Sequence, residues 1–362
     1  MGRIRPASID AVIGDRPPGL GPPWEHDLAG RIELGVVAGR ALVGNHLGDP
    51  ADRPVLVQLP PGYDDDPKRR YPSVYVLQGY AGMLTDWSRR TLLRPTTPEL
   101  VDTAFRAGDA PGCIVVWVDA WTRLGGSQFL DSAGTGAYQT YLCEDVVAFV
   151  DAAYRTLPAA AHRGVLGLSS GGYGAAMAAM ARPEVFGAFA SHAGDASFET
   201  CLAADLARAY RLLRDRYDRD FAAWEAALAA DPAVPGPDEF PLLMIHALSA
   251  CYSPAPDGRP LLPFDPATGD RREDVFARWL ALDPLNVAPA RADACASLRA
   301  VWIDAGRDDD YHLDLGAERL ARALRGAGAP LVVHELFPGT HQHLARRYPL
   351  SVAFLSTHLA ET

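Results

Sequence analysis

The sequence of 362 residues has few cysteines and lacks a long apolar run. The five cysteines are an odd number without the paired spacing of metal ligands, so we expect neither a disulfide framework nor a zinc site. The simplest interpretation is a reducing, cytoplasmic compartment. We expect no signal peptide, because residues 1–20 contain no suitable apolar stretch. No run approaches the roughly 18 apolar residues of a membrane-spanning helix, so we expect no membrane partner.

Positive charge is also scarce. The chain has 34 lysines and arginines against 45 acidic residues, which gives a net charge of -11. Its arginines form short, scattered pairs, whereas nucleic-acid binding needs a concentrated basic face, so we expect no nucleic-acid partner. A hydrophobic content of 48% is enough for a large core. The length fits two small domains or one large α/β domain with an insertion.

From residue 31 onward, short β-branched segments closed by glycine or proline alternate with helical patterns. The expected strands are 31–37, 54–60, 73–79, 113–120, 163–169, 300–306 and 330–339, with helices over 141–157 and 315–328. Nearly continuous apolar strands separated by helices predict a mostly parallel sheet covered on both faces, that is, an α/β fold. Residues 1–30 are rich in proline and glycine, and we interpret them as an N-terminal arm before a single domain over 31–362.

This alternation breaks between about 198 and 290. Apolar residues recur every three or four positions from Leu202 to Leu228, which predicts a long amphipathic helical segment. A proline-rich loop and a short helical piece follow. Two interpretations stay open: the insertion covers the sheet as a structural element, or it is a lid that shapes a substrate pocket.

The pattern G-x-S-x-G occurs at 167–171, centred on Ser169. By itself this pattern is weak, but an apolar strand runs into it and a helix of small residues leaves it. Strand, tight turn and helix are typical of a nucleophile elbow, which presents a serine hydroxyl at the end of a sheet. A glycine-rich phosphate-binding turn is the alternative, yet no Walker lysine accompanies the motif. Ser170 is the rival nucleophile, but it lacks flanking glycines in register.

An activated serine needs a base, and the base needs an acid that orients it. In α/β-hydrolases the order is Ser, acid, His, each after a late strand. Three consecutive acids follow the strand that ends at Gly306, and the spacing from this glycine favours Asp309 over Asp308. A solvated turn or a weak cation site is the alternative for this acidic run. After the next strand, His341 directly follows a Gly-Thr turn and is favoured over His343.

The loop after the strand 73–79 is the candidate for the oxyanion hole. The backbone N–H of Tyr80, together with that of Ser170, is positioned to stabilise a tetrahedral oxyanion. Aromatic residues on or beside loops are candidates for the walls of the substrate pocket, with packing in the core as the alternative for each. These residues are Trp87, Trp121, Phe129, Tyr138 and Tyr173.

Three segments carry a family resemblance: VLVQLPPGYDDDPKRRYPSVYVLQGYAG at 55–82, GGSQFLDSAGTG at 125–136 and GLSSGGYGA at 167–175. From about residue 33 onward the chain resembles the putative-esterase family of α/β-hydrolases. That family includes esterase D/S-formylglutathione hydrolase, feruloyl and enterochelin esterases, and the antigen 85 mycolyltransferases. The resemblance implies the α/β-hydrolase fold without cofactor or metal.

The same resemblance implies that Ser169 is the nucleophile, Asp309 the acid and His341 the base, with the amides of Tyr80 and Ser170 in the oxyanion hole. The chain departs from the family at Gln78, where many members have histidine, and at Ser170, where methionine is frequent. Its insertion is also longer than in the compact members.

The expected function is hydrolysis of a small carboxylic ester or thioester through an acyl-enzyme on Ser169. Transfer of the acyl group to an alcohol by the same residues is one alternative. A non-catalytic binding protein on a hydrolase fold is an alternative from another class, which the complete set of catalytic residue types disfavours. Because dimers are common among soluble proteins, we also expect a homodimer.

Overall fold

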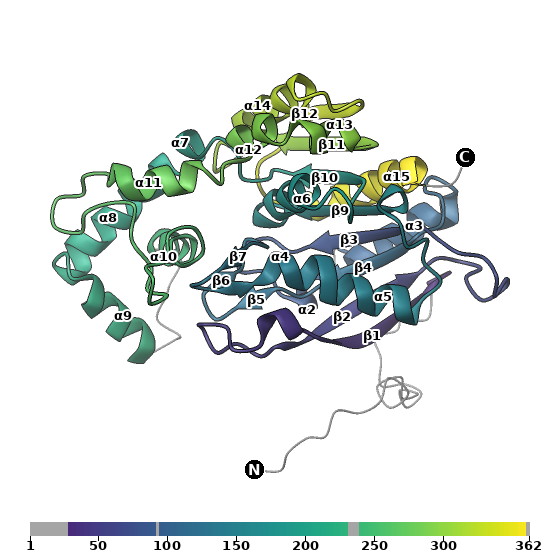
Figure 1. Ribbon diagram of the computed structural model, residues 1–362, viewed down its shortest axis with the longest axis horizontal. Helices are drawn as coiled ribbons and strands as arrows, with labels where there is room; N and C mark the ends of the chain where they lie inside the picture. Colours follow the sequence, from purple (N-terminus) through teal and green to yellow (C-terminus); the bar gives the residue numbers. More distant parts are fainter. Residues whose placement is uncertain (1–27, 92–93, 231–238, 360–362) are drawn as a thin grey trace, which may run out of the picture.

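A computed structural model describes residues 28–91, 94–230 and 239–359 (Figure 1). Its centre is an eight-stranded sheet in the order β1-β2-β4-β3-β9-β10-β11-β12. These strands are β1 (Arg31–Ala38), β2 (Asp52–Leu59), β3 (Ser73–Leu77), β4 (Ile114–Val118), β9 (Arg163–Leu168), β10 (Ala188–His192), β11 (Ala300–Gly306) and β12 (Val332–Phe337). Strand β2 is antiparallel to both of its neighbours and the other pairs are parallel. The mostly parallel α/β sheet predicted from the sequence is confirmed. Of the predicted N-terminal arm, residues 1–27 lie outside the described residues.

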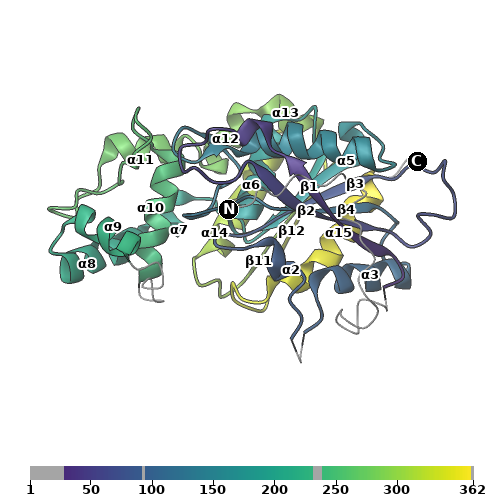
Figure 2. The same ribbon diagram turned by 90° about the horizontal axis from the view of Figure 1, so that it is seen from below.

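Helices cover both faces of the sheet, as Figure 2 shows. One layer contains α2 (Leu84–Trp87), α3 (Thr97–Ala107) and α15 (Tyr348–Leu359), and the other contains α5 (Val147–Ala153), α6 (Ser170–Ala181) and α14 (Leu313–Gly326). Alternation along the central strands explains the two layers. In β3, Val74 and Val76 pack into the first layer, whereas Tyr75 and Leu77 pack into the second. Strand β4, with the sequence IVVWV, is apolar throughout for the same reason, because both of its faces are buried.

Strand β10 was not among the strands expected from the sequence. Its five residues, AFASH, are short and mostly small, so they lack the β-branched pattern on which the prediction rested. All five are buried between β9 and β11. Small side chains suit this central position because α6 packs closely on the strand.

Shorter elements follow β4 in the chain. The hairpins β5 (Trp121–Thr122) with β6 (Gly125–Gly126), and β7 (Asp131–Ser132) with β8 (Gly136–Ala137), precede α4 (Tyr138–Thr140). A π-helical segment, η3 (Tyr141–Val146), then leads into α5, so the helix expected over 141–157 is present but begins with wider turns. Single 3-10 turns are η2 (Arg40–Leu42), η4 (Ala160–His162) and η6 (Leu344–Arg347).

The insertion consists of helices, several of which project beyond the end of the sheet (Figure 1). These are α7 (Phe198–Cys201), α8 (Ala203–Tyr217), α9 (Phe221–Ala230), α10 (Phe240–Tyr252), α11 (Glu273–Leu280) and α12 (Pro284–Ala290), and α13 (Ala292–Ser297) follows the insertion. The predicted long helical segment is split into α8 and α9. Asp218 and Arg219, with φ of 48° and 67°, adopt the left-handed conformation, which a continuous right-handed helix does not allow. Helix α12 returns to the core and packs on α6 and α14.

We expect the insertion to lose stability at acidic pH because of His246 on α10. The side chain is 6% exposed and lies against the rings of Phe221 and Trp224, with centroid distances of 5.4 and 5.2 Å. Burial lowers the pKa of His246 from 6.5 to about 4. Between these values the unfolded chain binds a proton that the folded protein excludes. The contribution of neutral His246 to stability is therefore fully present above pH 6.5. The free energy of unfolding falls by about 3 kcal/mol as the pH drops towards 4.

Chemical denaturation of the wild type, His246→Leu and His46→Gln between pH 7.5 and 4.5 measures this effect. His46 is exposed, so its variant should keep the pH slope of the wild type, whereas His246→Leu should flatten it. An unchanged slope in His246→Leu would show that other groups determine the acid sensitivity.

Candidate active site

Ser169 forms the turn between β9 and α6. Its backbone has φ 56° and ψ −127°, a conformation that residues other than glycine rarely adopt. Its N–H donates to the carbonyl of His192, at the end of the neighbouring β10, over 2.9 Å. Strand, strained turn and helix thus occur where the sequence predicted a nucleophile elbow, and the serine lies at the carboxyl end of the sheet.

The glycines that flank Ser169 allow unusually close backbone packing. A Cβ on Gly167 would lie 2.3 Å from the carbonyl carbon of Gly171. A Cβ on Gly171 would lie 2.4 Å from the carbonyl oxygen of Leu77 and 2.5 Å from that of Gln78. The turn is therefore pressed against the end of β3 and the loop that follows it.

We expect Gly171→Ala to destabilise the fold by about 2 to 3 kcal/mol, since the backbone must move to admit a methyl group. A displacement of the turn by a fraction of an ångström should also lower kcat/KM for an ester by about 10²-fold. Gly326→Ala is the matched control, because a Cβ there meets nothing within 4 Å. It should leave activity intact and stabilise by up to about 1 kcal/mol. Equal thermal stability of the two variants would contradict the packing argument.

Asp309 and His341 form a hydrogen-bonded pair on the loops after β11 and β12. The Nδ1 atom of His341 lies 2.8 Å from Oδ2 of Asp309. The other oxygen of Asp309 accepts the N–H groups of Tyr311, at 2.9 Å, and Leu313, at 3.3 Å. The ring of Tyr311 meets the imidazole edge to face at 4.9 Å. The fully buried carboxylate of Asp309 is thus held by three hydrogen bonds, and the bond to His341 in turn orients the imidazole.

Asp308 and His343, the alternative acid and base, form hydrogen bonds with other groups. Asp308 is exposed, and its N–H donates to the carbonyl of Gly339 at 3.0 Å. His343 is also exposed, and its ring nitrogens lie 2.7 and 2.9 Å from the guanidinium of Arg94. Of the four side chains weighed from the sequence, Asp309 and His341 are the two that the structure joins by a hydrogen bond.

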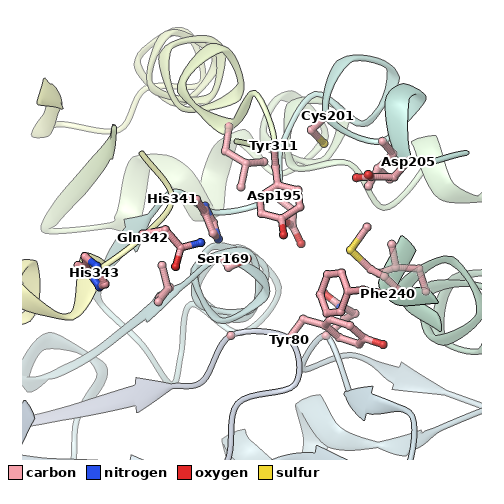
Figure 3. Close-up of a pocket in the computed structure, with 17 residues that line it drawn as sticks. Tyr80, Ser169, Asp195, Cys201, Asp205, Phe240, Tyr311, His341, Gln342 and His343 are labelled. Carbon is pink, nitrogen blue, oxygen red and sulfur yellow. The ribbon is translucent and has the colours of Figure 1, made fainter. Parts of the chain in front are cut away.

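A cavity of about 290 Å³ contains both Ser169 and His341 in its lining (Figure 3). Gly79 and Tyr80, from the loop after β3, line it as well. A Cβ on Gly79 would lie 3.6 Å from the Cβ of Ser169, so this loop passes directly beside the serine. Gln78 supports the loop through its Nε2, which donates to the carbonyl of Gly82 at 2.7 Å. Gln78, which stands where many family members have histidine, therefore fixes this loop.

The five aromatic residues proposed as pocket walls do not line this cavity. They are Trp87, Trp121, Phe129, Tyr138 and Tyr173. Four are buried in the core, and Trp121 is partly buried in β5. Their positions near loops suggested a pocket, but their rings fill space inside the protein. Tyr173, for example, packs against Phe198 at 5.9 Å, and its hydroxyl donates to the carbonyl of Leu282 at 3.1 Å.

Other residues form the walls, and several come from the insertion. The apolar and aromatic ones are Tyr80, Leu168, Cys201, Leu202, Phe240, Met244, Leu248, Tyr311 and Leu313. Helix α10 supplies three of these side chains, so the insertion shapes the cavity in addition to covering the fold. The sequence signalled an amphipathic insertion, but no local pattern indicated which of its residues face Ser169.

Asp195 is a further candidate site residue, which the sequence analysis missed. It follows β10, itself not predicted, and lines the cavity. Burial raises the pKa of its carboxyl to about 7, with His341 acting in the opposite direction and Asp309 adding to the rise. A carboxyl group that titrates near neutrality inside a cavity is typical of functional sites.

A second arrangement of Ser, His and Asp lies under the site and is fully buried. His192 Nδ1 is 2.7 Å from Asp304, and its Nε2 is 2.8 Å from the hydroxyl of Ser351. Although burial opposes ionisation, His192 and Arg347 hold the pKa of Asp304 below its usual value. None of the three residues Ser351, His192 and Asp304 lines the cavity. Because the carbonyl of His192 accepts the N–H of Ser169, this network supports the turn from behind.

Within the described residues, no group of three or more histidine, cysteine or acidic side chains is arranged to hold a metal ion. All five cysteines are buried and unpaired. Burial raises the pKa of the Cys201 thiol, the one that lines the cavity, well above its ordinary value, so this thiol is a poor nucleophile. No helix in the described part of the chain combines the length and apolar character needed to cross a membrane.

Solved structures of esterases share this fold. A ferulic acid esterase matches with a TM-score of 0.56 and 17% identity over 92% of this chain and 100% of its own. An S-formylglutathione hydrolase from Agrobacterium tumefaciens matches with a TM-score of 0.55 and 14% identity, over 92% and 97% of the two chains. A fluorophosphonate-binding serine hydrolase from Staphylococcus aureus matches with a TM-score of 0.53 and 14% identity, over 90% and 98%.

The sequence itself matches the family model described as Putative esterase over residues 49–344. The matched region begins just before β2, includes the turn at Ser169 and both catalytic candidates after β11 and β12, and spans most of the chain. The chain therefore belongs to the Putative esterase family and is a carboxylic ester hydrolase with the α/β-hydrolase fold.

Proposed function

We propose that the protein cleaves a carboxylic ester or thioester through an acyl-enzyme on Ser169. The observation that carries this proposal is the 2.8 Å bond between Asp309 and His341, in a cavity lined by both His341 and the strained Ser169. With Nδ1 bonded to the carboxylate, Nε2 of His341 is the nitrogen left to accept a proton.

In the first half-reaction, Oγ of Ser169 attacks the acyl carbon and its proton passes to Nε2 of His341. The carbonyl oxygen becomes an oxyanion and accepts the N–H groups of Tyr80 and Ser170. Ser170 is the first residue of α6, so its N–H has no acceptor in the preceding turn of that helix. The bond to the leaving group then breaks, and His341 returns the proton to the departing alkoxide or thiolate.

In the second half-reaction, water replaces the alcohol or thiol. His341 removes a proton from the water as its oxygen attacks the acyl carbon of the ester on Ser169. Collapse of this second oxyanion breaks the bond to Oγ, which recovers the proton from His341, and the carboxylic acid leaves. Throughout both steps, Asp309 keeps the imidazole oriented and stabilises its protonated form.

Labelling with a fluorophosphonate, followed by mass-spectrometric mapping, tests the activated serine. We expect the adduct on Ser169, together with hydrolysis of short p-nitrophenyl esters. A folded protein that takes up no adduct and cleaves no ester would favour the non-catalytic alternative. If hydrolysis occurs, product partitioning with added alcohols separates hydrolysis from acyl transfer, because a transferase gives the new ester as the main product.

A further inference from the structure

We infer that Asp195 and Asp205 form an anionic subsite that selects ester or thioester substrates carrying an ammonium group. This inference rests on the proposed function and names its substrate class. Both acids line the cavity that contains Ser169, and they come from separate elements, the loop after β10 and helix α8. In the view of Figure 3, Asp195 lies between Ser169 and Asp205. The two carboxyl groups thus extend from the reacting serine into the part of the cavity walled by the insertion.

Among the described residues, none donates a hydrogen bond to the carboxyl group of Asp195, although the side chain is partly buried. The other acids near it are engaged. Asp309 accepts three bonds, Asp283 accepts the N–H groups of Ser197, Phe198 and Leu285, and Asp205 pairs with Arg208 at 3.3 Å. A desolvated carboxyl group that accepts no hydrogen bond destabilises the protein unless a ligand supplies the donor.

The charged groups around Asp195 favour the binding of a cation. The carboxylates of Asp309, Asp205 and Asp283 repel its negative charge, and the imidazole of His341 is the nearby group that favours it. The thiol of Cys201 and the phenols of Tyr173 and Tyr252 also lie close, and burial keeps all three neutral. Acidic groups therefore outnumber the one imidazole around Asp195, and this balance favours a cationic ligand.

The remaining lining favours an organic ammonium group over a bare ion. Tyr80, Phe240 and Tyr311 place aromatic rings in the same cavity, and aromatic faces attract ammonium groups through cation–π interactions. Leu202, Met244 and Leu248 supply apolar surface for the methyl or methylene groups that surround such a nitrogen. A volume of about 290 Å³ suits a small ester with the nitrogen a few bonds from the acyl carbon.

Two matched pairs of esters test the subsite. The two esters of a pair differ only at one position, which is a quaternary nitrogen in one ester and a quaternary carbon in the other. Acetylcholine and 3,3-dimethylbutyl acetate place the group in the alcohol. Ethyl betainate and ethyl 3,3-dimethylbutanoate place it in the acyl part. The readout is the ratio of kcat/KM, cationic over neutral, within each pair. Comparing this ratio between variants cancels the intrinsic reactivity of the esters.

For at least one pair we expect Asp195→Asn to lower the ratio by about 10-fold or more. Asp205→Asn should lower it less, because Arg208 already offsets that charge. Asp218→Asn is the matched control, since it removes the same charge from a fully exposed side chain of the insertion. Its ratio should equal that of the wild type, which rules out an effect of net charge alone.

A measurement on the wild type keeps the test independent of how the variants fold. Because the pKa of Asp195 is about 7, its ionised fraction falls about tenfold between pH 8 and pH 6, and the ratio should fall with it. A ratio that is unaffected by both Asp195→Asn and pH, in both pairs, would overturn the subsite while leaving the esterase intact. Failure of every ester and of fluorophosphonate labelling would instead overturn the proposed function.

Discussion

Replacing Ser169 with alanine should lower kcat for ester hydrolysis by about 10⁴-fold or more and abolish fluorophosphonate labelling. The substitution removes the atom that forms the acyl-enzyme, so the only route left is direct attack by water. The fold should persist, because the turn depends on Gly167 and Gly171 rather than on the hydroxyl. Steady-state kinetics, mass spectrometry and a thermal melt of the same sample check these three expectations.

The buried serine in the second arrangement of Ser, His and Asp provides the matched control. Ser351 lies 2.8 Å from His192, just as a nucleophile would lie near its base, but it is fully buried and outside the cavity. Ser351→Ala should therefore keep the adduct on Ser169 and most of the activity. Loss of labelling in Ser351→Ala with retention in Ser169→Ala would reverse the assignment of the two serines.

Replacing Asp309 with asparagine should lower kcat by about 10³- to 10⁴-fold with little change in the fold. The carboxylate accepts from Nδ1 of His341, whereas an amide can donate to that atom and so favour the tautomer with its proton on Nε2. His341 would then be unable to take the proton of Ser169. The amide oxygen can still accept the N–H groups of Tyr311 and Leu313, so the loop should keep its conformation.

Asp308→Asn separates this effect from a general loss of acidic charge. The two aspartates are adjacent, but Asp308 is exposed and makes no bond to His341 among the described residues. Its variant should keep kcat within about twofold of the wild type. A larger loss in Asp308→Asn than in Asp309→Asn would identify Asp308 as the acid and contradict the geometry.

Local sequence patterns predicted much of the framework. Strand β3 is a short apolar run bounded by proline and glycine, and such runs indicate a buried strand without knowledge of its neighbours. The turn at Ser169 was predictable because its two glycines, the strand before it and the helix after it are contiguous. The acid and the base were also within reach, since chain order places Asp309 and His341 after successive late strands.

Long-range packing determined the rest. Strand β10 has no apolar pattern of its own and is a strand because β9 and β11 pair with it on both sides. Because β10 was not predicted, Asp195, which follows it in the chain, was missed as well. The five aromatic residues proposed as pocket walls were judged by their closeness to loops. Four of the rings are nevertheless buried in the core and Trp121 is partly buried, because the direction of a side chain depends on what packs against it.

By itself, then, the sequence determined the α/β class, the turn that presents Ser169, and the order of nucleophile, acid and base, because these features depend on residues close together in the chain. Only the tertiary structure decided that Asp309 rather than Asp308 meets His341, that α10 walls the cavity, and that no residue in the described part of the chain donates to Asp195 there. Those features depend on distances between residues far apart in sequence, and such distances follow from the packing of whole elements.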